Sequence, residues 1–320
     1  MTKEAIAYNI EKYLVLTGIP RGPKSKIYFV DPENGSDANV GGSWLAPLKT
    51  LTAAEDKCVA NQHDVVIMLA GATADNPAAA IEWDKDYTHL IGLSGNLPGL
   101  GQRCRVVGTA ALDLAQVITF SGDGCIIKNV QFYNGNDAAA DSGAAIVSGS
   151  RNYFENCMFA GMTAATPGAR SGCYSLSLTG DENVFVRCSI GLQTIIRAAG
   201  NAELILSGGN CMRNKFIGCE FLSWSVTAGK FLVKFAADAV PWTTQFENCL
   251  FNNLHMTAGG AAGSMVNNAI GDSSTAFHQV ILRGDNPIVG CTGAADTLTH
   301  IWSAQAVPAT GFGIAVNPAA

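Results

Sequence analysis

The sequence contains few charged residues and no long apolar run, and each absence excludes a class of protein. Only 14% of the 320 residues are charged, and the formal net charge is -6. The acidic balance argues against the basic surface of a nucleic-acid-binding protein and no run of Lys or Arg opposes this, so we expect no nucleic-acid partner. No stretch approaches the roughly 18 consecutive apolar residues that a membrane-spanning helix needs, so we expect no membrane partner.

The first residues lack the apolar core of a secretory signal. Residues 1 to 18 are interrupted by Glu4, Asn9, Glu11 and Lys12. The apolar positions of this segment fit one face of a helix instead: Ala5, Ile6, Ile10, Tyr13 and Leu14. We therefore expect a short N-terminal helix and synthesis in a cytoplasm.

The ten cysteines include no Cys-x-x-Cys pair. The closest two are Cys211 and Cys219, a spacing that structural zinc sites do not use. In a long chain without a secretory signal, free thiols are more typical than a disulfide framework. The cysteines therefore predict neither a metal centre nor disulfide bonds.

Residues 126 to 251 contain an internal repeat. Five segments align: IIKNVQF (126 to 132), YFENCMF (153 to 159), VFVRCSI (184 to 190), KFIGCEF (215 to 221) and QFENCLF (245 to 251). One column of the alignment is mostly cysteine, with steps of 27, 31, 31 and 30 residues: Val130, Cys157, Cys188, Cys219 and Cys249. Two residues later comes a large apolar column: Phe132, Phe159, Ile190, Phe221 and Phe251. Positions i and i+2 of a strand share a face, so both columns predict a stacked interior.

The column before the cysteines predicts a bend. It contains Asn129, Asn156, Arg187, Gly218 and Asn248. Asn and Gly enter the left-handed backbone region most readily, so a sharp turn between two short strands is expected here. Arg187 does not fit this preference and suggests a different local bend at its position.

These repeats predict an all-β protein, a parallel β-helix preceded by the short N-terminal helix. A unit of roughly 30 residues with several short strands cannot bury its apolar face alone, so it must stack on its neighbours. Less regular rungs precede the repeat at residues 64 to 71, 86 to 95 and 104 to 110, and others follow at 264 to 272 and 277 to 291.

The segment YFVDPENGSD, followed by APLKTLTAA, resembles the N-terminal signature of right-handed parallel β-helix proteins of the pectate-lyase-like superfamily. The resemblance covers residues 27 to about 60 and implies a short helix that covers the open end of the solenoid. The asparagines of the bend column likewise resemble the asparagine ladder of that fold. Thr52 is the expected N-cap of the helix, with Glu55 completing a capping box.

We divide the chain into four parts on this basis. Residues 1 to 26 form an N-terminal arm, 27 to 63 a cap, 64 to 295 the parallel β-helix, and 296 to 320 a C-terminal tail. A terminal rung exposes apolar residues and unpaired backbone groups, which explains the need for a cap.

The acidic loop of the cap offers an alternative calcium hypothesis. Its oxygen-bearing residues are Asp31, Glu33, Asn34, Asp37 and Asn39. An EF-hand loop requires Gly at its sixth position and Glu at its twelfth, where this chain has Ser36 and Gly42. The simpler interpretation is that Asp31 and Asn34 bond to their own turn.

Carboxylates on the repeat do not form a convincing catalytic pair. Glu155 and Glu247 share a register, but Val186 and Ile217 occupy the rungs between them. Acid–base pairs of glycosidases lie within about 5 to 10 Å of each other. The remaining aspartates are expected at solvated turns or alone: Asp123, Asp181, Asp272, Asp141 and Asp238.

Histidine and cysteine give no stronger signal. The five histidines share neither a register nor a metal-ligand spacing: His63, His89, His255, His278 and His300. His63 lies near Cys58, but a lone Cys on a capping helix is more typical of packing than of a nucleophile. We therefore name no catalytic, cofactor-binding or metal-binding residue.

Two functional classes remain. The first is a non-enzymatic structural protein of a phage particle, because β-helices, commonly trimeric, are familiar there. Within it we favour a capsid decoration or cement protein in the virion, a homotrimer contacting the major capsid protein, with residues 1 to 26 as the anchor. The alternative is a tail-fibre or tailspike-type protein that binds or cleaves polysaccharide. It predicts an exposed groove with aligned aromatic residues and carboxylates, such as Trp224, Trp242 and Glu220.

Overall fold

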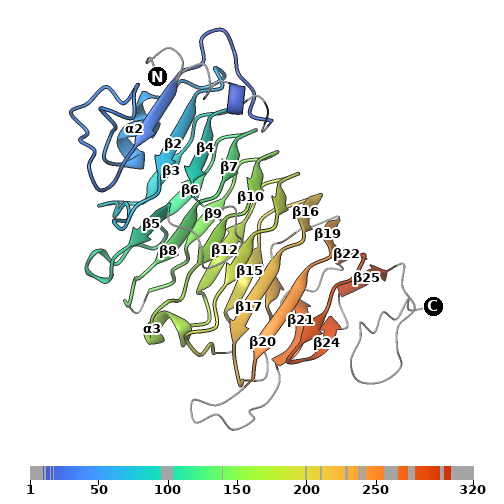
Figure 1. Cartoon of the computed structure of the whole chain (residues 1–320). Helices are drawn as coiled ribbons and strands as arrows, with labels where there is room; N and C mark the ends of the chain where they lie inside the picture. Colours follow the sequence, from blue (N-terminus) through green and yellow to red (C-terminus); the bar gives the residue numbers. More distant parts are fainter. Residues whose placement is uncertain are drawn as a thin grey trace.

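The chain folds into a parallel β-helix, as predicted (Figure 1). A computed structural model describes residues 10 to 303, except 11, 15, 17, 95–103, 139, 199, 210, 228–229, 237–238, 240–242, 256–265, 273–277 and 296–298. The strands form three parallel sheets, here named A, B and C, and from β3 onward each turn of the solenoid takes one strand from each sheet in the order C, A, B. One such turn is a rung.

The three sheets run the length of the described chain. Sheet A contains β1 (Ile27–Val30), β2 (Val65–Leu69), β4 (His89–Leu93), β7 (Ile126–Lys128), β10 (Tyr153–Glu155), β13 (Val184–Val186), β16 (Asn214–Ile217), β19 (Thr244–Glu247), β22 (His278–Arg283) and β25 (Thr299–Ser303). Sheet B contains β5 (Arg105–Gly108), β8 (Gln131–Asn134), β11 (Met158–Ala160), β14 (Ser189–Gly191), β17 (Glu220–Trp224), β20 (Leu250–Leu254) and β23 (Ile288–Val289). Sheet C contains β3 (Ile81–Trp83), β6 (Ile118–Phe120), β9 (Ala145–Val147), β12 (Tyr174–Leu178), β15 (Ala202–Leu206), β18 (Val233–Phe235), β21 (Val266–Asp272) and β24 (Cys291–Ala295).

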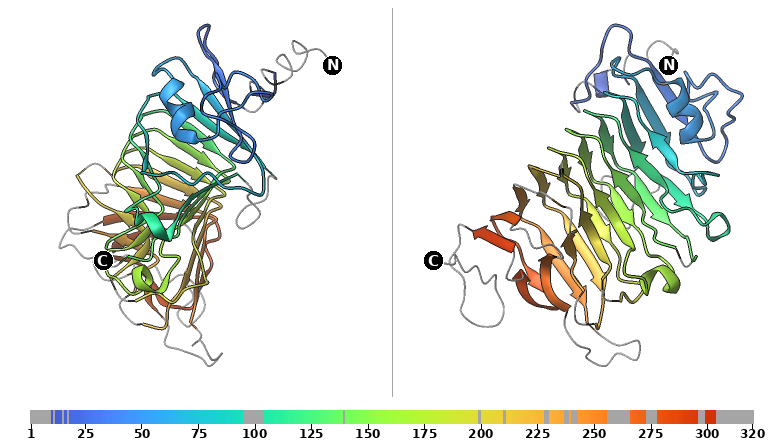
Figure 2. Two further views of the ribbon diagram at one scale, coloured as in Figure 1. Left: turned by 90° about the vertical axis from the view of Figure 1, so that its left-hand side faces the viewer. Right: turned by 180° about the vertical axis from the view of Figure 1, so that it is seen from behind.

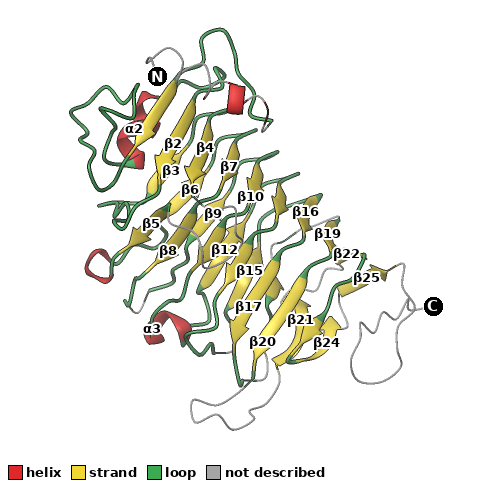
Figure 3. Cartoon of the chain, in the orientation of Figure 1, coloured by secondary structure: helices red, strands yellow, loops and turns green. Residues whose placement is uncertain are grey.

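The few helices lie outside this stack, and the views in Figures 2 and 3 show one elongated solenoid with α2 at its N-terminal end. Those with defined bounds are α2 (Leu51–Lys57), α3 (Ala165–Gly168) and the short 3-10 helix η1 (Ala110–Leu112). The described residues 10, 12 to 14 and 16 of the predicted N-terminal helix are also helical. Leu51 and Ala54 of α2 are fully buried in the main core, so this helix covers the first rung as the cap prediction required. None of the helices in the described part of the chain is long and apolar enough to cross a membrane.

Aromatic rings stack through the interior. In sheet A, Phe154, Phe185 and Phe216 are in register, and their ring centroids lie 4.7 and 4.8 Å apart. The predicted sheet B column is also buried, with Phe221 stacked on Phe251 at 4.9 Å. Offset stacking of this kind adds roughly 0.5 to 1.5 kcal/mol per pair beyond the burial of apolar area.

The cysteine column lies in the core with its thiols reduced. Cys157, Cys188, Cys219 and Cys249 are buried, and all ten cysteines are free. Each of the four thiols donates to a carbonyl of the preceding rung; for example, Cys219 Sγ lies 3.4 Å from Phe185 O. The column therefore packs as small apolar residues that also satisfy a weak donor.

The predicted bend is confirmed, but the expectation of a different bend at Arg187 is wrong. All five residues of the column between sheets A and B adopt positive φ: Asn129 (60°), Asn156 (52°), Arg187 (51°), Gly218 (61°) and Asn248 (53°). Arg187 therefore makes the same bend as its neighbours. Its side chain forms an ion pair with Glu155 on the preceding rung, which compensates for a residue that disfavours this region.

A second, fully buried asparagine ladder was not predicted. Cys125 N donates to Asn152 Oδ1, Asn152 N to Asn183 Oδ1, and Asn183 N to Asn214 Oδ1, at 2.7 to 2.9 Å. Each amide nitrogen of the ladder also donates to a glycine carbonyl, as Asn183 Nδ2 does to Gly149 O. The ladder satisfies backbone groups that the corner between sheets C and A would otherwise bury unpaired.

The predicted helix cap is off by two residues. Thr50, rather than Thr52, precedes α2, and its Oγ1 accepts a hydrogen bond from Ala53 N. Glu55 does not close a capping box, because it pairs with Lys85 at 2.7 Å instead. Thr50 is held in place by Asp37, whose carboxylate accepts bonds from Lys49 N and Thr50 N.

The structure also shows strands in the segments assigned to cap and tail. β1 belongs to sheet A, although residues 27 to 63 were assigned to the cap. β25 continues sheet A within the expected tail, and residues 304 to 320 lie outside the described part of the chain.

Candidate functional site

A pocket of about 600 Å³ opens on the outer surface at the corner where sheet C turns into sheet A. Its lining comes from four successive rungs and from the N-terminal arm: Gly18, Pro20, His63, Tyr87, Asp123, Gly124, Ile126, Lys128, Arg151 and Tyr153. Because parallel rungs are about 4.8 Å apart, the lining extends across the rungs rather than along one strand.

One column of unusual backbone supplies much of this lining. Each sheet A strand from β2 to β16 is preceded by a left-handed residue: His63 (φ 59°), Tyr87 (54°), Gly124 (65°), Arg151 (58°), Glu182 (57°) and Arg213 (56°). Glycine is the residue that this conformation favours, yet only one of the six is glycine. A residue with a side chain in the left-handed conformation lowers the free energy of unfolding by roughly 1 to 2 kcal/mol. The column therefore places large polar side chains on the corner at a cost in stability.

Gly124 is the one glycine of the column, because the ring of Tyr87 lies where a side chain at position 124 would be. A Cβ on Gly124 would lie 2.5 Å from the ring of Tyr87, so the bare backbone lets that ring lie against the next rung. Tyr87 is 42% exposed and contacts His63 edge to face, with centroids 5.5 Å apart. One ring of the pocket is thus fixed by a glycine on the neighbouring rung.

His63 is held by a buried histidine. Its ring stacks on His89, and the two nitrogens His63 Nδ1 and His89 Nε2 lie 3.1 Å apart. Burial lowers the pKa of His89 to about 3, so its ring is neutral. Because Ile126 N donates to His89 Nδ1, the proton of His89 is on Nε2 and is donated to His63. His63 accepts this bond at Nδ1.

The floor of the pocket joins a network of charges on the outer face of sheet A. Lys128 lies 2.9 Å from Glu155 and 5.5 Å from the centroid of the Tyr153 ring. Burial raises the pKa of Glu155, but the hydrogen bond and charge of Lys128 and the charge of Arg187 outweigh it and lower that pKa below its usual value. Burial and Glu155 raise the pKa of Tyr153 to about 12, so its hydroxyl stays protonated. Lys128 and Tyr153 thus line the pocket while both contact the ionised carboxylate of Glu155 beside it.

A second chain of ion pairs follows the corner. Glu182 lies between Arg151, at 2.7 Å, and Arg213, at 2.8 Å. The two arginines are exposed, with 69% of the Arg151 side chain accessible. Their guanidinium groups are available to a ligand on their outer side, although each exposed ion pair contributes little to stability.

Two aspartates at this corner accept hydrogen bonds from backbone amides. Asp123 Oδ1 accepts from Ser150 N, and Asp181 Oδ1 accepts from Met212 N, both at 2.7 Å. Each thus joins its turn to the next rung, which explains why Asp recurs there. Asp141 forms an exposed ion pair with Arg170 at 3.1 Å. Asp238 and the side chain of Asp272 lie outside the described residues.

The predicted separation of Glu155 and Glu247 is confirmed by the strand register. Glu155, Val186, Ile217 and Glu247 are consecutive partners across β10, β13, β16 and β19. Three steps of about 4.8 Å place the two carboxylate positions about 14 Å apart, which is too far for one acid–base pair.

The other candidate residues of the cap have structural roles. Cys58 Sγ donates to Ala54 O, burial raises the pKa of this thiol, and His63 is bonded to His89 instead. Asp31 accepts from Glu33 N and Asn34 N, as the turn interpretation predicted. Within the described residues, no three His, Cys, Asp or Glu side chains are grouped to hold a metal ion.

Trp224 lies in a second, shallower pocket of about 480 Å³, beside α3. Its lining is mainly apolar: Ala165, Ala169, Thr194, Ile195, Ile196, Arg197, Ala198, Trp224 and Thr227. Glu220 occupies the outer face of the same strand, and Trp242 lies outside the described residues. This pocket has one large aromatic ring among its lining residues and therefore fits the predicted row of aromatic residues poorly.

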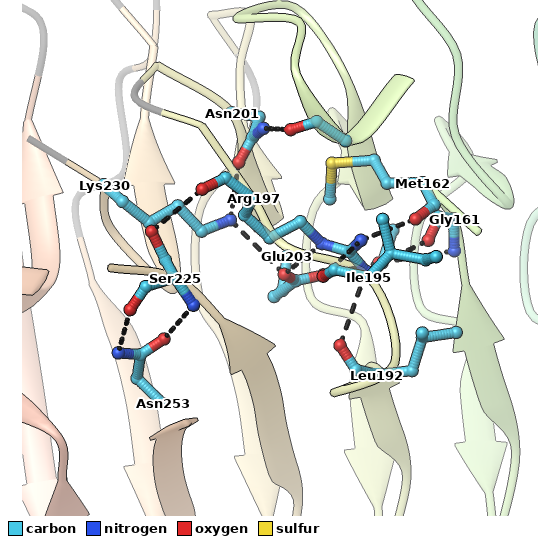
Figure 4. Close-up of polar contacts among 12 residues, drawn as sticks. Gly161, Met162, Leu192, Ile195, Arg197, Asn201, Glu203, Ser225, Lys230 and Asn253 are labelled. Atoms are coloured by element: carbon cyan, nitrogen blue, oxygen red, sulfur yellow. Dashed lines mark hydrogen bonds and ion pairs between the residues drawn. The ribbon is translucent and has the colours of Figure 1, made fainter. Parts of the chain in front are cut away.

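Beneath the second pocket is a buried charge cluster that the sequence did not reveal (Figure 4). Arg197 and Lys230 bond to one oxygen of Glu203, at 3.1 and 3.3 Å, and all three side chains are fully buried. Arg197 also donates to main-chain carbonyls of Gly161, Met162, Leu192 and Ile195. Since its donors are used within the protein, the cluster ties loops together and offers nothing to a ligand.

The pocket at the corner of sheets C and A was not predicted, although the sequence carries a signal for the corner residues of the regular rungs. Asn152, Asn183 and Asn214 each stand five residues before a cysteine of the repeat. The residue before each of them is the left-handed corner residue: Arg151, Glu182 and Arg213. In the irregular early rungs, which supply His63 and Tyr87, no such spacing marks the column.

Comparisons with known proteins support the fold. No protein-family model and no curated protein sequence matches the chain. Pectate lyase Pel9A is similar in structure, with 14% identity, a TM-score of 0.58, and coverage of 90% of this chain and 76% of that one. Pectin methylesterases from Aspergillus niger (16% identity, TM-score 0.54, coverage 88% and 85%) and Erwinia chrysanthemi (15%, 0.51, 86% and 80%) are also similar. At these identities the similarity establishes the parallel β-helix and nothing further.

Proposed function

We propose that this protein binds an oligosaccharide in the pocket at the corner of sheets C and A. The observation that carries the proposal is the left-handed column, which places His63, Tyr87 and Arg151 on one surface at a cost in backbone strain. Strained backbone that holds side chains in a pocket is a reason to test that pocket as a functional site.

The chemistry of the lining suits a sugar chain. Tyr87 and Tyr153 provide ring faces, while Lys128 and Arg151 provide hydrogen-bond donors. A volume of about 600 Å³ falls within the usual range of small-molecule sites, roughly 300 to 1,000 Å³. The exposed guanidinium group of Arg151, which pairs with Glu182 through Nε, is a charged donor that favours sugars carrying a carboxylate. The structural neighbours named pectate lyase and pectin methylesterase are named for pectic polysaccharides, which motivates a pectic sugar as the first ligand to test.

Isothermal titration calorimetry with oligogalacturonate and with a neutral cello-oligosaccharide tests the proposal. We expect heat of binding with the acidic sugar, and loss of about tenfold or more in affinity for Tyr87→Ala, which is about 1.4 kcal/mol. Tyr133→Ala is the matched control, because Tyr133 lies on the outer face of β8 in sheet B. Absence of binding to both sugars, or equal losses in the two variants, contradicts the proposal.

Substitutions in the left-handed column separate binding from folding. Arg151→Gly relieves backbone strain and removes one exposed ion pair, so the free energy of unfolding should stay unchanged or rise by about 1 kcal/mol. Affinity for the sugar should nevertheless fall. Gly124→Ala should weaken binding by displacing the ring of Tyr87. Loss of stability together with affinity in Arg151→Gly would point to a purely structural column.

The proposal concerns binding without cleavage. Incubation with the same sugars followed by a reducing-end assay should show no new chain ends. The prediction of a phage structural protein, trimeric and bound to a major capsid protein, stays a prediction. Quantitative mass spectrometry of purified particles is its test, and hundreds of copies per particle would support it.

A further inference from the structure

We infer that the pocket receives the end of a glycan chain rather than an internal segment; this inference rests on the proposed function. The pocket is closed on one side by the N-terminal arm and open on the other, along the rungs of sheet A. The arm thereby acts as a wall that determines which part of a polymer can bind.

The wall is formed where the arm crosses the first strands of sheet A. Leu14 and Ile19 are buried in one apolar cluster with outward-facing residues of β1, β2 and β4: Phe29, Val65, Ile67 and Ile91. Gly18 and Pro20, on either side of Ile19, line the pocket. The outer face of sheet A beyond the pocket in this direction is therefore occupied by the protein's own chain.

Hydrogen bonds fix the arm in this place. Arg21 Nη1 and Ser25 Oγ both donate to His63 O, so the arm is attached to a residue of the pocket itself. Lys26 N donates to Asp64 Oδ1 at 2.6 Å, and the other oxygen of Asp64 accepts from Val59 N. Because several bonds and a buried cluster hold it, the wall is a permanent part of the site.

On the opposite side the face of sheet A stays accessible. Ile126 and Tyr153 of the pocket are followed in register by Val184, Lys215 and Gln245. Lys215 is exposed, and Val184 and Gln245 are half-buried. A polymer can therefore extend across these rungs, while its terminal sugar meets Gly18 and Pro20.

Stoichiometry against chain length tests the inference. Two narrow size fractions of oligogalacturonate, one several-fold longer than the other, are titrated into the full-length protein by calorimetry. End recognition predicts one protein per chain for both fractions. A protein-to-chain ratio that rises with length would overturn end recognition and leave the proposed function intact, whereas no binding of either fraction would overturn both.

Blocking each end of the longer fraction gives an independent measurement. A bulky label is attached to the reducing end in one sample and to the non-reducing end in another. One label should reduce affinity more than tenfold, and the other, on the end far from the wall, should have no effect. Unchanged affinity in both samples would overturn the inference.

Discussion

Glu203 is the common partner of the two buried cations in the charge cluster. It is fully buried, yet Lys230 and Arg197 outweigh burial and keep its pKa below the usual value. Ser175 Oγ donates to its second oxygen at 2.7 Å, so the carboxylate is satisfied on both sides. Such a cluster is stable only when every member is present, because a buried charge without its partner is strongly unfavourable.

Replacing Glu203 by Gln should therefore destabilise the fold by about 3 to 5 kcal/mol, since two buried cations lose their anion. Urea denaturation measures the change. Glu220→Gln is the control, because Glu220 is half-buried on the outer face of β17, and it should cost under about 1 kcal/mol. Equal effects in both variants would show that the buried cluster is not needed for stability.

Lys230 makes part of the stability depend on pH. Burial lowers its pKa from 10.5 to about 8, the charge of Glu203 opposing that shift. Between these two values the unfolded chain binds more protons than the folded chain, so the free energy of unfolding rises with pH. The free energy of unfolding of the wild type minus that of Lys230→Met should accordingly become more positive from pH 8 towards pH 10. Chemical denaturation at several pH values measures it, and a constant or falling difference would contradict the assignment.

At the scale of the strand, the repeat made the stacked interior predictable. The Cys and Phe columns lie where the alignment placed them, because identical rungs bring identical side chains together. The bend at Arg187 was misjudged, since propensity alone ignores its ion pair with Glu155. The pocket could not be predicted, because His63 and Tyr87 come from irregular early rungs and the arm reaches them only through tertiary contacts.

The inward and outward faces of one strand should respond differently to truncation. Phe221→Ala in β17 should cost about 3 to 5 kcal/mol, because its buried ring stacks on Phe251 and its removal leaves a cavity. Leu222→Ala, the next residue on the outer face, should cost clearly less. Thermal or urea unfolding of both variants measures this, and similar losses would show that the column is not the main core.

Breaking the asparagine ladder should lower the free energy of unfolding through lost hydrogen bonds rather than through lost apolar burial. Asn183→Ala leaves Asn152 N and Gly149 O without their partners inside the corner. Each unpaired buried group costs about 1 to 3 kcal/mol, so the variant should lose more stability than Lys215→Ala, an exposed change on the adjacent rung. Hydrogen exchange at Asn152 N should also accelerate. Unchanged exchange at that amide would show that the ladder is dispensable.

For the whole molecule, the solenoid and the arm together form the pocket at the corner of sheets C and A, near the N-terminal end of the stack. The fold class followed from repeat length and composition, and the structural neighbours share it at 14 to 16% identity. Function depends on the side chains placed on that fold. The central claim is that the corner pocket of sheets C and A is the binding site.

A crystal structure of the protein with a bound oligogalacturonate tests this claim most directly. We predict that the sugar lies over His63, Tyr87 and Tyr153, with its terminal residue against Gly18 and Pro20. A sugar bound beside Trp224, or elsewhere on sheet B, would contradict the claim.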